Sequence, residues 1–316
     1  MAASEEHPLV YSIPMRTRFR GVDVREGMLL HGPSGWGEFS PFWDYDAAQS
    51  APWLRAAHEA AYVGWPSPRR TSVPVNVTVP AVGPDLAREV VLASRGCRTA
   101  KVKVAEPGQS EADDLARVEA VRDALGAGGR VRVDANGAWD VDTALRMVRL
   151  LDRAAGGLEY VEQPCRTVEE LAAVRRRVDV PVAADESIRR AEDPLRVAAL
   201  GAADIAVLKV APLGGVAASL RVAERIGLPV VVSSALETSV GIAAGVALAA
   251  ALPELDHACG LATLSLLDGD VTSTPWQVVD GALEVSRPEP DLAAAVAADD
   301  PTARRWHDRL HEVRLV

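Results

Sequence analysis

The sequence predicts an α/β fold: a (β/α)8 barrel of the TIM type, with an α+β capping domain formed by the N-terminal segment and the C-terminal tail. Two observations predict it. From Ser72 onward, short β-branched runs alternate with amphipathic stretches at a period of roughly 25 to 30 residues, and eight such runs can be counted. Polar residues recur at the ends of most runs, where such a barrel places its reacting groups. A doubly wound open sheet is the structural alternative.

The first 71 residues are expected to form the N-terminal part of the cap, because they lack the period of the barrel. Alternating apolar residues predict strands over Leu9–Ile13, Val24–His31 and Trp36–Phe39. A helix-like stretch over Asp46–Tyr62 follows. This mixture of strands and one helix is typical of a small α+β unit.

Residues 72–270 are expected to form the barrel, and the last of its eight runs is the weakest. The predicted strands are Pro74–Val79, Ala100–Val104, Val131–Asn136, Glu159–Gln163, Val182–Asp185, Ile205–Val210, Pro229–Ser234 and Asp256–Leu261. Helical periodicity fills the intervals, for example over Asp113–Leu125, Thr143–Leu151, Val168–Val178 and Val216–Ile226.

Residues 271–316 are expected to return to the cap. Asp280-Gly281, between Trp276–Val279 and Ala282–Val285, is the pattern of a two-residue hairpin turn. Earlier in the chain, the small apolar stretch Val240–Leu252 is shorter than the roughly 20 residues of a membrane-spanning helix. We therefore expect a buried helix there.

Composition limits the classes of partner. The 316 residues are 48% hydrophobic and carry a formal net charge of -10, which disfavours binding to a nucleic-acid backbone or an anionic membrane. Three cysteines at unrelated spacings, and an acidic opening over Met1–Pro8 without the order of a signal peptide, predict a cytoplasmic protein. No sequence feature marks an oligomer interface.

Lysine use is strongly uneven. Of the 34 basic residues, only Lys101, Lys103 and Lys209 are lysines, and all others are arginines. Arginine stays protonated in proteins, whereas burial can bring a lysine to give and take a proton near neutral pH. The three lysines therefore need a specific explanation.

Strand alternation places these lysines together with acidic residues. Lys101 and Lys103 share one face of their strand, which in a barrel points inward, although an edge strand with a solvated charged face would show the same spacing. The same alternation places Asp134 and Asn136 on one face of the third predicted strand. Glu162, Asp185 and Lys209 lie at the ends of the fourth, fifth and sixth predicted strands.

Three carboxylates end three consecutive predicted strands: Asp134, Glu162 and Asp185. Each taken alone could cap the following helix. Together, without a cation, they would repel one another strongly inside a barrel. Three separate oxygen donors suit Mg²⁺, with Mn²⁺ as a substitute, whereas no histidine ends a strand at a spacing that suits zinc.

A divalent cation between lysines defines a chemistry. The cation can hold a substrate carboxylate and stabilise the enediolate that forms when the neighbouring carbon loses a proton. One lysine then serves as the base, and the opposite lysine remains an ammonium that stabilises the developing charge. The sequence thus predicts a small-molecule carboxylate as substrate.

These residues resemble the enolase superfamily, and more closely its muconate-lactonizing branch. The resemblance covers essentially the whole chain, including the cap signature Gly35–Pro41. It implies that Lys103 and Lys209 are catalytic, that Lys101 and Asn136 support them, and that Asp134, Glu162 and Asp185 hold Mg²⁺.

Within the superfamily, the segments Asp134–Trp139, Glu162–Cys165, Asp185–Ser187 and Ser233–Gly241 most resemble the o-succinylbenzoate synthases of menaquinone biosynthesis. The resemblance implies a hydro-lyase that carries out syn dehydration of 2-succinyl-6-hydroxy-2,4-cyclohexadiene-1-carboxylate through an enediolate. Lys103 would remove the α-proton and then protonate the departing hydroxyl, and Lys209 would stay cationic.

Two further segments are candidates for substrate contact. Gly214, Gly215, Ser233 and Ser234 are placed to offer backbone N–H groups or hydroxyls to a substrate carboxylate, although helix geometry alone would also explain them. The segment Arg16–Arg20 could close over the site as a loop.

Other functions remain open at this stage. N-acylamino-acid racemisation needs the same two lysines, one on each face of the substrate. Dipeptide epimerases also use them but usually carry an Asp-x-Asp after the eighth strand, which Cys259–Ser265 lacks. A catalytically silent barrel that binds a small acid is the remote alternative.

Overall fold

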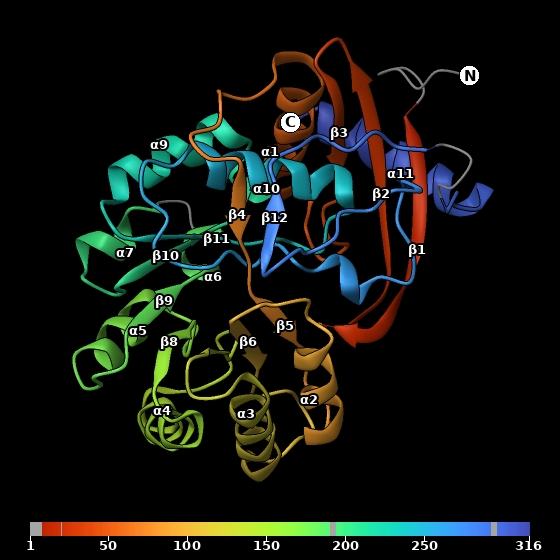
Figure 1. Ribbon diagram of the computed structural model, residues 1–316. Helices are drawn as coiled ribbons and strands as arrows, with labels where there is room; N and C mark the ends of the chain where they lie inside the picture. Colours follow the sequence, from red (N-terminus) through yellow and green to blue (C-terminus); the bar gives the residue numbers. More distant parts are fainter. Residues whose placement is uncertain (1–7, 20, 190–193, 292–295) are drawn as a thin grey trace.

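The computed structural model describes residues 8–19, 21–189, 194–291 and 296–316. Its centre is a parallel sheet of seven strands that follow one another in chain order and curl into a barrel (Figure 1). The strands are β5 (Val77–Val79), β6 (Thr99–Lys103), β7 (Arg130–Asp134), β8 (Leu158–Glu162), β9 (Val182–Ala184), β10 (Ile205–Leu208) and β11 (Val230–Val232). Sequential order without a reversal excludes the doubly wound alternative.

A two-residue segment closes the barrel between its first and last strands. Cys259 forms a parallel bridge with Val75, and Gly260 forms one with Ser233. Backbone hydrogen bonds run to both neighbours, from Cys259 N to the Pro74 carbonyl at 2.7 Å and from Gly260 N to the Val232 carbonyl at 2.8 Å. The fold class is therefore confirmed, but the predicted eighth strand is reduced to these two residues.

Side chains reinforce this short eighth segment at the amino-terminal end of the barrel. The guanidinium of Arg132 donates to the Ala258 carbonyl at 2.7 Å, to Asn76 Oδ1 at 3.2 Å and to the Glu159 carboxylate. His257 Nδ1 lies 3.0 Å from Glu159 Oε1. We call Asn76, Arg132, Glu159 and His257 the lower cluster. It ties the eighth segment to β7 and β8 where few ladder bonds exist.

A register shift on β8 makes the lower cluster possible. Val131 pairs with Leu158, but Arg132 pairs with Tyr160, so Glu159 is an extra residue on β8. Such a bulge turns a side chain away from the regular alternation. Glu159 can therefore accept hydrogen bonds from Arg132 and from Arg130, the latter at 3.0 Å.

Helices cover the outside of the barrel, and four of them confirm the sequence predictions. The helices between the strands are α2 (Pro84–Leu92), α3 (Glu111–Leu125), α4 (Val141–Ala155), α5 (Val168–Arg175), α6 (Glu186–Arg189), α7 (Arg196–Ala199), α8 (Val210–Leu213), α9 (Val216–Ile226) and α10 (Ser239–Ala251). Capping boxes begin α3 at Ser110 and α5 at Thr167. Valines such as Val102 and Val133 fill the layer between sheet and helices.

α10 is the buried small-residue helix that the sequence predicts. No helix in the described ranges is both long and apolar enough to cross a membrane. After the eighth segment the chain forms only the short helix η2 (Leu264–Leu266) before the C-terminal part.

The cap joins both ends of the chain beside the barrel (Figure 1). Its antiparallel sheet contains β1 (Leu9–Phe19), β2 (Val22–Gly32) and β3 (Gly35–Phe39). The helix α1 (Ala47–His58) continues into a π-helical turn, η1 (Glu59–Val63), and α11 (Asp300–Arg314) packs on α1. The predicted strands and helix are confirmed, and β1 runs six residues further than its predicted end at Ile13.

The predicted hairpin after residue 275 is wrong in its pairing. Asp280 and Gly281 both have positive φ and form the turn, but only one bridge, Val279 to Ala282, spans it. β12 (Ala282–Glu284) pairs instead with β4 (Ser72–Pro74). β4 precedes the first predicted barrel strand, overlaps it only at Pro74, and provides this partner.

Candidate active site

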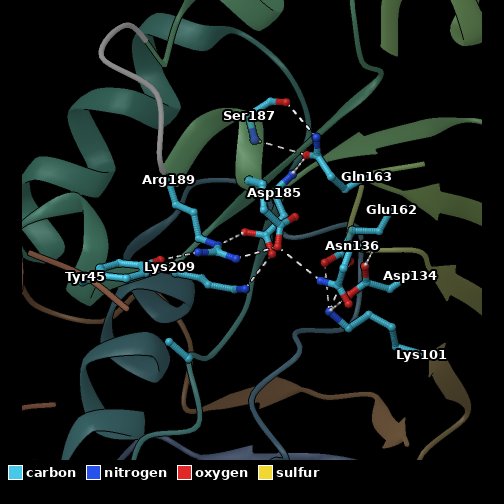
Figure 2. Close-up of polar contacts among 12 residues, drawn as sticks. Tyr45, Lys101, Asp134, Asn136, Glu162, Gln163, Asp185, Ser187, Arg189 and Lys209 are labelled. Atoms are coloured by element: carbon cyan, nitrogen blue, oxygen red, sulfur yellow. Dashed lines mark hydrogen bonds and ion pairs between the residues drawn. The ribbon is translucent and has the colours of Figure 1, made fainter. Parts of the chain in front are cut away.

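The inward side chains at the carboxyl ends of β6, β7 and β8 stand in one row. Lys103 pairs with Asp134, and Asp134 pairs with Glu162 across the sheet. Asp185 and Lys209 follow β9 and β10 directly. All five side chains are buried. Figure 2 shows the carboxylates turned toward the ammonium and guanidinium groups of the site.

Lys101 lies one layer below this row and contacts two of the carboxylates. Its Nζ is 3.0 Å from Glu162 Oε1 and 3.4 Å from Asp134 Oδ2. Burial alone would lower the pKa of Lys101, but the Glu162 and Asp134 carboxylates raise it well above its usual range. Burial and the charge of Asp134 raise the pKa of Glu162 to about 7, against the opposing effect of Lys101. The contacts with Glu162 and Asp134 thus favour the ammonium form of Lys101.

Lys103 is held between an acid and an amide. Its ammonium contacts Asp134 Oδ2 and donates to Asn136 Oδ1 at 2.8 Å. Burial would raise the pKa of Asp134, but Lys103 and Lys101 hold it well below its usual range. The Phe19 ring lies 5.2 Å from Lys103 Nζ, in cation–π range. The sequence analysis did not single out Phe19 by itself, but this residue belongs to the segment Arg16–Arg20 that was expected to close over the site.

Lys209 approaches the third carboxylate. Its Nζ donates to Asp185 Oδ2 at 2.6 Å, and Arg189 Nε donates to Asp185 Oδ1 at 2.9 Å. Gln163 Oε1 accepts from the backbone N–H groups of Asp185 and Ser187 and so fixes the start of α6 (Figure 2). The sequence analysis did not single out Arg189, although its i, i+4 spacing from Asp185 is a usable signal.

The donor set fits a hard divalent cation by its chemistry. Asp134, Glu162 and Asp185 are buried oxygen donors on successive strand ends, and Mg²⁺ prefers carboxylate oxygens. Within the described ranges no three acidic, histidine or cysteine side chains already stand close enough together to hold a metal. The lysines and Arg189 neutralise the carboxylates here, so a cation would have to displace part of these contacts.

Ser233 and Ser234 lie in the same cavity as the lysines. Ser234 Oγ is 2.7 Å from Thr263 Oγ1. The cavity is lined by Phe19, Thr78, Lys101, Lys103, Lys209, Ser233, Ser234, Ala235, Leu236, Gly260 and Thr263. Leu236 belongs to the segment Ser233–Gly241 that the sequence analysis singled out, whereas Thr78 and Thr263 carry no charge or motif that would have marked them in the sequence.

Gly214 and Gly215 stand elsewhere, at the start of α9 under the cap. The Glu59 carboxylate accepts from the backbone N–H groups of Val216 and Ala217, the latter at 2.9 Å. A Cβ on Gly215 would come within 2.5 Å of Glu59 Oε2. A cap side chain thus binds the helix start that the sequence assigned to a substrate carboxylate, and neither glycine lines the cavity of the lysines.

Phe19 of the segment Arg16–Arg20 lines the cavity of the lysines, in agreement with the expectation that this segment covers the site, but the segment is not the expected loop. Residues 16–19 are the end of β1, and Arg16 Nε donates to the Leu267 carbonyl at 2.8 Å. Arg20 lies outside the described residues.

Comparisons with known proteins agree with this architecture. The family described as Enolase C-terminal domain-like matches residues 85–311, and the family described as Enolase N-terminal domain-like matches residues 10–61. Among solved structures, the L-Ala-D/L-Glu epimerase from Bacillus subtilis superposes with a TM-score of 0.75 at 23% identity, over 92% of this chain and 98% of that one. Muconate lactonizing enzyme from Pseudomonas fluorescens superposes with a TM-score of 0.75 at 23% identity, over 95% of this chain and 97% of that one.

Curated relatives are much more similar in sequence. The o-succinylbenzoate synthase of Thermobifida fusca is 66% identical over 305 residues, which cover 96% of this chain and 95% of the relative. Those of Mycolicibacterium smegmatis and Mycobacterium tuberculosis are each 58% identical over 303 residues, covering 95% of this chain and 93% and 91% of the relatives. This chain therefore belongs to the enolase superfamily and, within it, to the family of o-succinylbenzoate synthases.

Proposed function

We propose that this chain is an Mg²⁺-dependent hydro-lyase that converts 2-succinyl-6-hydroxy-2,4-cyclohexadiene-1-carboxylate to 2-succinylbenzoate. One observation carries the proposal. Lys103, the last residue of β6, and Lys209, which follows β10, line one cavity beside three buried carboxylates. Relatives of the same enzyme family at 58–66% identity support the choice of substrate.

Lys103 is the proposed base. Its Nζ would take the proton from the carbon next to the ring carboxylate and then donate that proton to the departing hydroxyl on the same face, as syn elimination requires. Asn136 Oδ1, 2.8 Å from this amine, would orient it during both transfers. The Phe19 ring would cover the amine and exclude water.

Lys209 is proposed to remain cationic opposite Lys103. Its ammonium, which donates to Asp185, would stabilise negative charge on the substrate without giving up its proton. Asp134, Glu162 and Asp185 would hold Mg²⁺. When bound, the cation would supply electrostatic stabilisation of the charge that develops on the substrate carboxylate. Ser233 and Ser234 are the polar groups placed to receive the rest of the substrate.

The purified protein and this substrate test the proposal directly. Loss of the diene absorbance should be fast, should stop when EDTA removes the metal, and should return with excess Mg²⁺. Absence of turnover with Mg²⁺ present would refute the assignment.

N-acylamino-acid racemisation is a second candidate, because an amine on each side of one cavity suits a two-base exchange. Incubation of an N-succinyl amino acid in D₂O would reveal it as deuterium at the α-carbon. We also propose a cytoplasmic location, which is supported by three buried cysteines that remain free thiols.

A further inference from the structure

A chain of side chains connects the cap to the third carboxylate of the site. Arg189 ends α6 and is buried. Its Nε donates to Asp185 Oδ1 at 2.9 Å, its Nη2 contacts Glu186, and its Nη1 donates to the phenol oxygen of Tyr45 in the cap (Figure 2). One guanidinium therefore links a cap residue to the barrel carboxylate.

Each of the two carboxylate oxygens of Asp185 accepts a hydrogen bond from a different cation. Lys209 takes Oδ2, and Arg189 takes Oδ1. Lysine is a flexible point charge that can turn to another partner, whereas the planar fork of arginine fixes the geometry of a carboxylate. Arg189 is thus the partner that sets the orientation of the Asp185 carboxylate when the lysine moves.

Tyr45 is itself rigidly held. Its ring packs edge-on against Phe42 and Trp53, with centroids 6.2 Å and 5.8 Å away. Its backbone carbonyl accepts from Arg309 Nη2 of α11 at 2.8 Å. The phenol oxygen therefore occupies a position that the C-terminal helix and the cap's aromatic core define together.

We propose that Tyr45 and Arg189 are positioning residues that hold Asp185 in the orientation that binds the cation. Through them, the position of the cap on the barrel affects the affinity for Mg²⁺. The inference rests on the proposed function, in which Asp185 is a metal ligand. Groups that orient a metal ligand typically change metal affinity 10- to 100-fold when they are altered. The cap would then contribute to metal binding without supplying a ligand.

Calorimetric titration of the substrate-free protein with Mg²⁺ tests this. Arg189→Lys keeps the positive charge but loses the fork, and should weaken Mg²⁺ binding by roughly 10- to 100-fold. Tyr45→Phe removes only the hydroxyl and should weaken it about three- to tenfold, the effect of one hydrogen bond. The matched control is Tyr62→Phe, which removes a cap hydroxyl bonded to the His31 carbonyl, remote from Asp185. It should bind Mg²⁺ like the wild type.

A double variant sharpens the result. If Tyr45 acts through Arg189, Tyr45→Phe should add little to the loss caused by Arg189→Lys. If the Tyr45→Phe variant binds Mg²⁺ as tightly as the Tyr62→Phe control, the inference is overturned. This outcome is decisive even if the Arg189→Lys variant does not fold. A wild-type protein that binds no Mg²⁺ would overturn it together with the metal dependence. Mg²⁺ binding with this pattern but without synthase turnover would refute the proposed reaction and leave the coupling standing.

Discussion

The barrel interior contains two buried groups of ion pairs that differ in their cations. At the carboxyl end, the three lysines of the chain contact Asp134, Glu162 and Asp185. At the amino end, the lower cluster pairs Arg132 with Glu159 and the eighth segment. The two groups lie in one barrel, and Lys101 pairs across the sheet with Arg132.

The difference follows from what each group has to do. Arg132 makes three contacts with fixed directions and rests over the Tyr160 ring at 4.7 Å, which suits a permanent charge that holds strands together. A lysine can release its proton when its surroundings change, which suits proton transfer. Lysine is thus the cation at the carboxyl, reactive end, where a proton has to move, whereas arginine makes the fixed contacts, Arg132 at the amino, structural end and Arg189 on Asp185.

The largest expected effect tests the reactive end. Lys103→Arg preserves the charge but replaces a group that can exchange a proton with one that cannot. Turnover should fall roughly 10²- to 10⁴-fold, the usual contribution of a general base. The melting temperature should stay close to that of the wild type. A variant that keeps most of its turnover would contradict the assignment of Lys103.

The opposite result is expected at the structural end. Arg132→Met leaves Glu159 buried beside His257 without its main cation. The free energy of unfolding should fall by about 3–5 kcal/mol, as when one partner of a buried ion pair is removed. Urea titration gives this value, and turnover of the remaining folded protein should persist. A loss of turnover without loss of stability would mean that the two ends are not separate in function.

Acid should weaken the structural end through Glu159. Burial would raise the pKa of Glu159, but hydrogen bonds from His257, Arg132 and Arg130 lower it to about 2, from an ordinary value of 4.5. A carboxyl group whose pKa is lowered by folding contributes its full stabilisation at pH values above its pKa in the unfolded state. This contribution is lost as the pH falls from about 4.5 toward 2. Wild type should therefore exceed Glu159→Gln in unfolding free energy at pH 7, and the gap should narrow over that acid range. A gap that is constant with pH would exclude this role.

The smallest effect is expected at His257. His257→Gln offers an amide donor to Glu159 in place of the ring nitrogen, 3.0 Å away in the wild type. The free energy of unfolding should change by no more than about 1 kcal/mol, the net value of a single hydrogen bond. Thermal unfolding of His257→Gln, measured alongside Arg132→Met, would rank the two residues by their contribution to stability. An equal loss from both would show that His257 contributes as much as Arg132 to anchoring the eighth segment.

The sequence predicted the reactive end better than the structural end for a physical reason. Strand alternation and chain order alone determine that Lys103, Asp134 and Glu162 are neighbours in a parallel barrel, and their pairing across the sheet agrees. Their roles in catalysis and metal binding stay predictions. The lower cluster depends on the bulge at Glu159, which no sequence pattern marks.

Most contacts between cap and barrel were also beyond sequence reasoning. Tyr45 and Glu59 reach the barrel from separate cap elements. Their partners are 144 and 158 residues away in the sequence, so no local spacing indicates these contacts. The hairpin at Asp280-Gly281 failed similarly, because β4 competes for β12 from a distant part of the chain.

The meeting of the two chain ends in the cap has a consequence for folding during synthesis. Ser12 N donates to the Val296 carbonyl at 3.0 Å, Ala298 N donates to the Val10 carbonyl at 3.1 Å, and α1 packs on α11. The strands β5 to β11 can pair as each leaves the ribosome, and β1 can pair with β2, but β1 gains its contacts with residues 296–298 and α11 only when these have been made almost 300 positions later. We expect the nascent segment β1 to stay more protease-sensitive than the barrel strands until α11 has been made and packs on the cap.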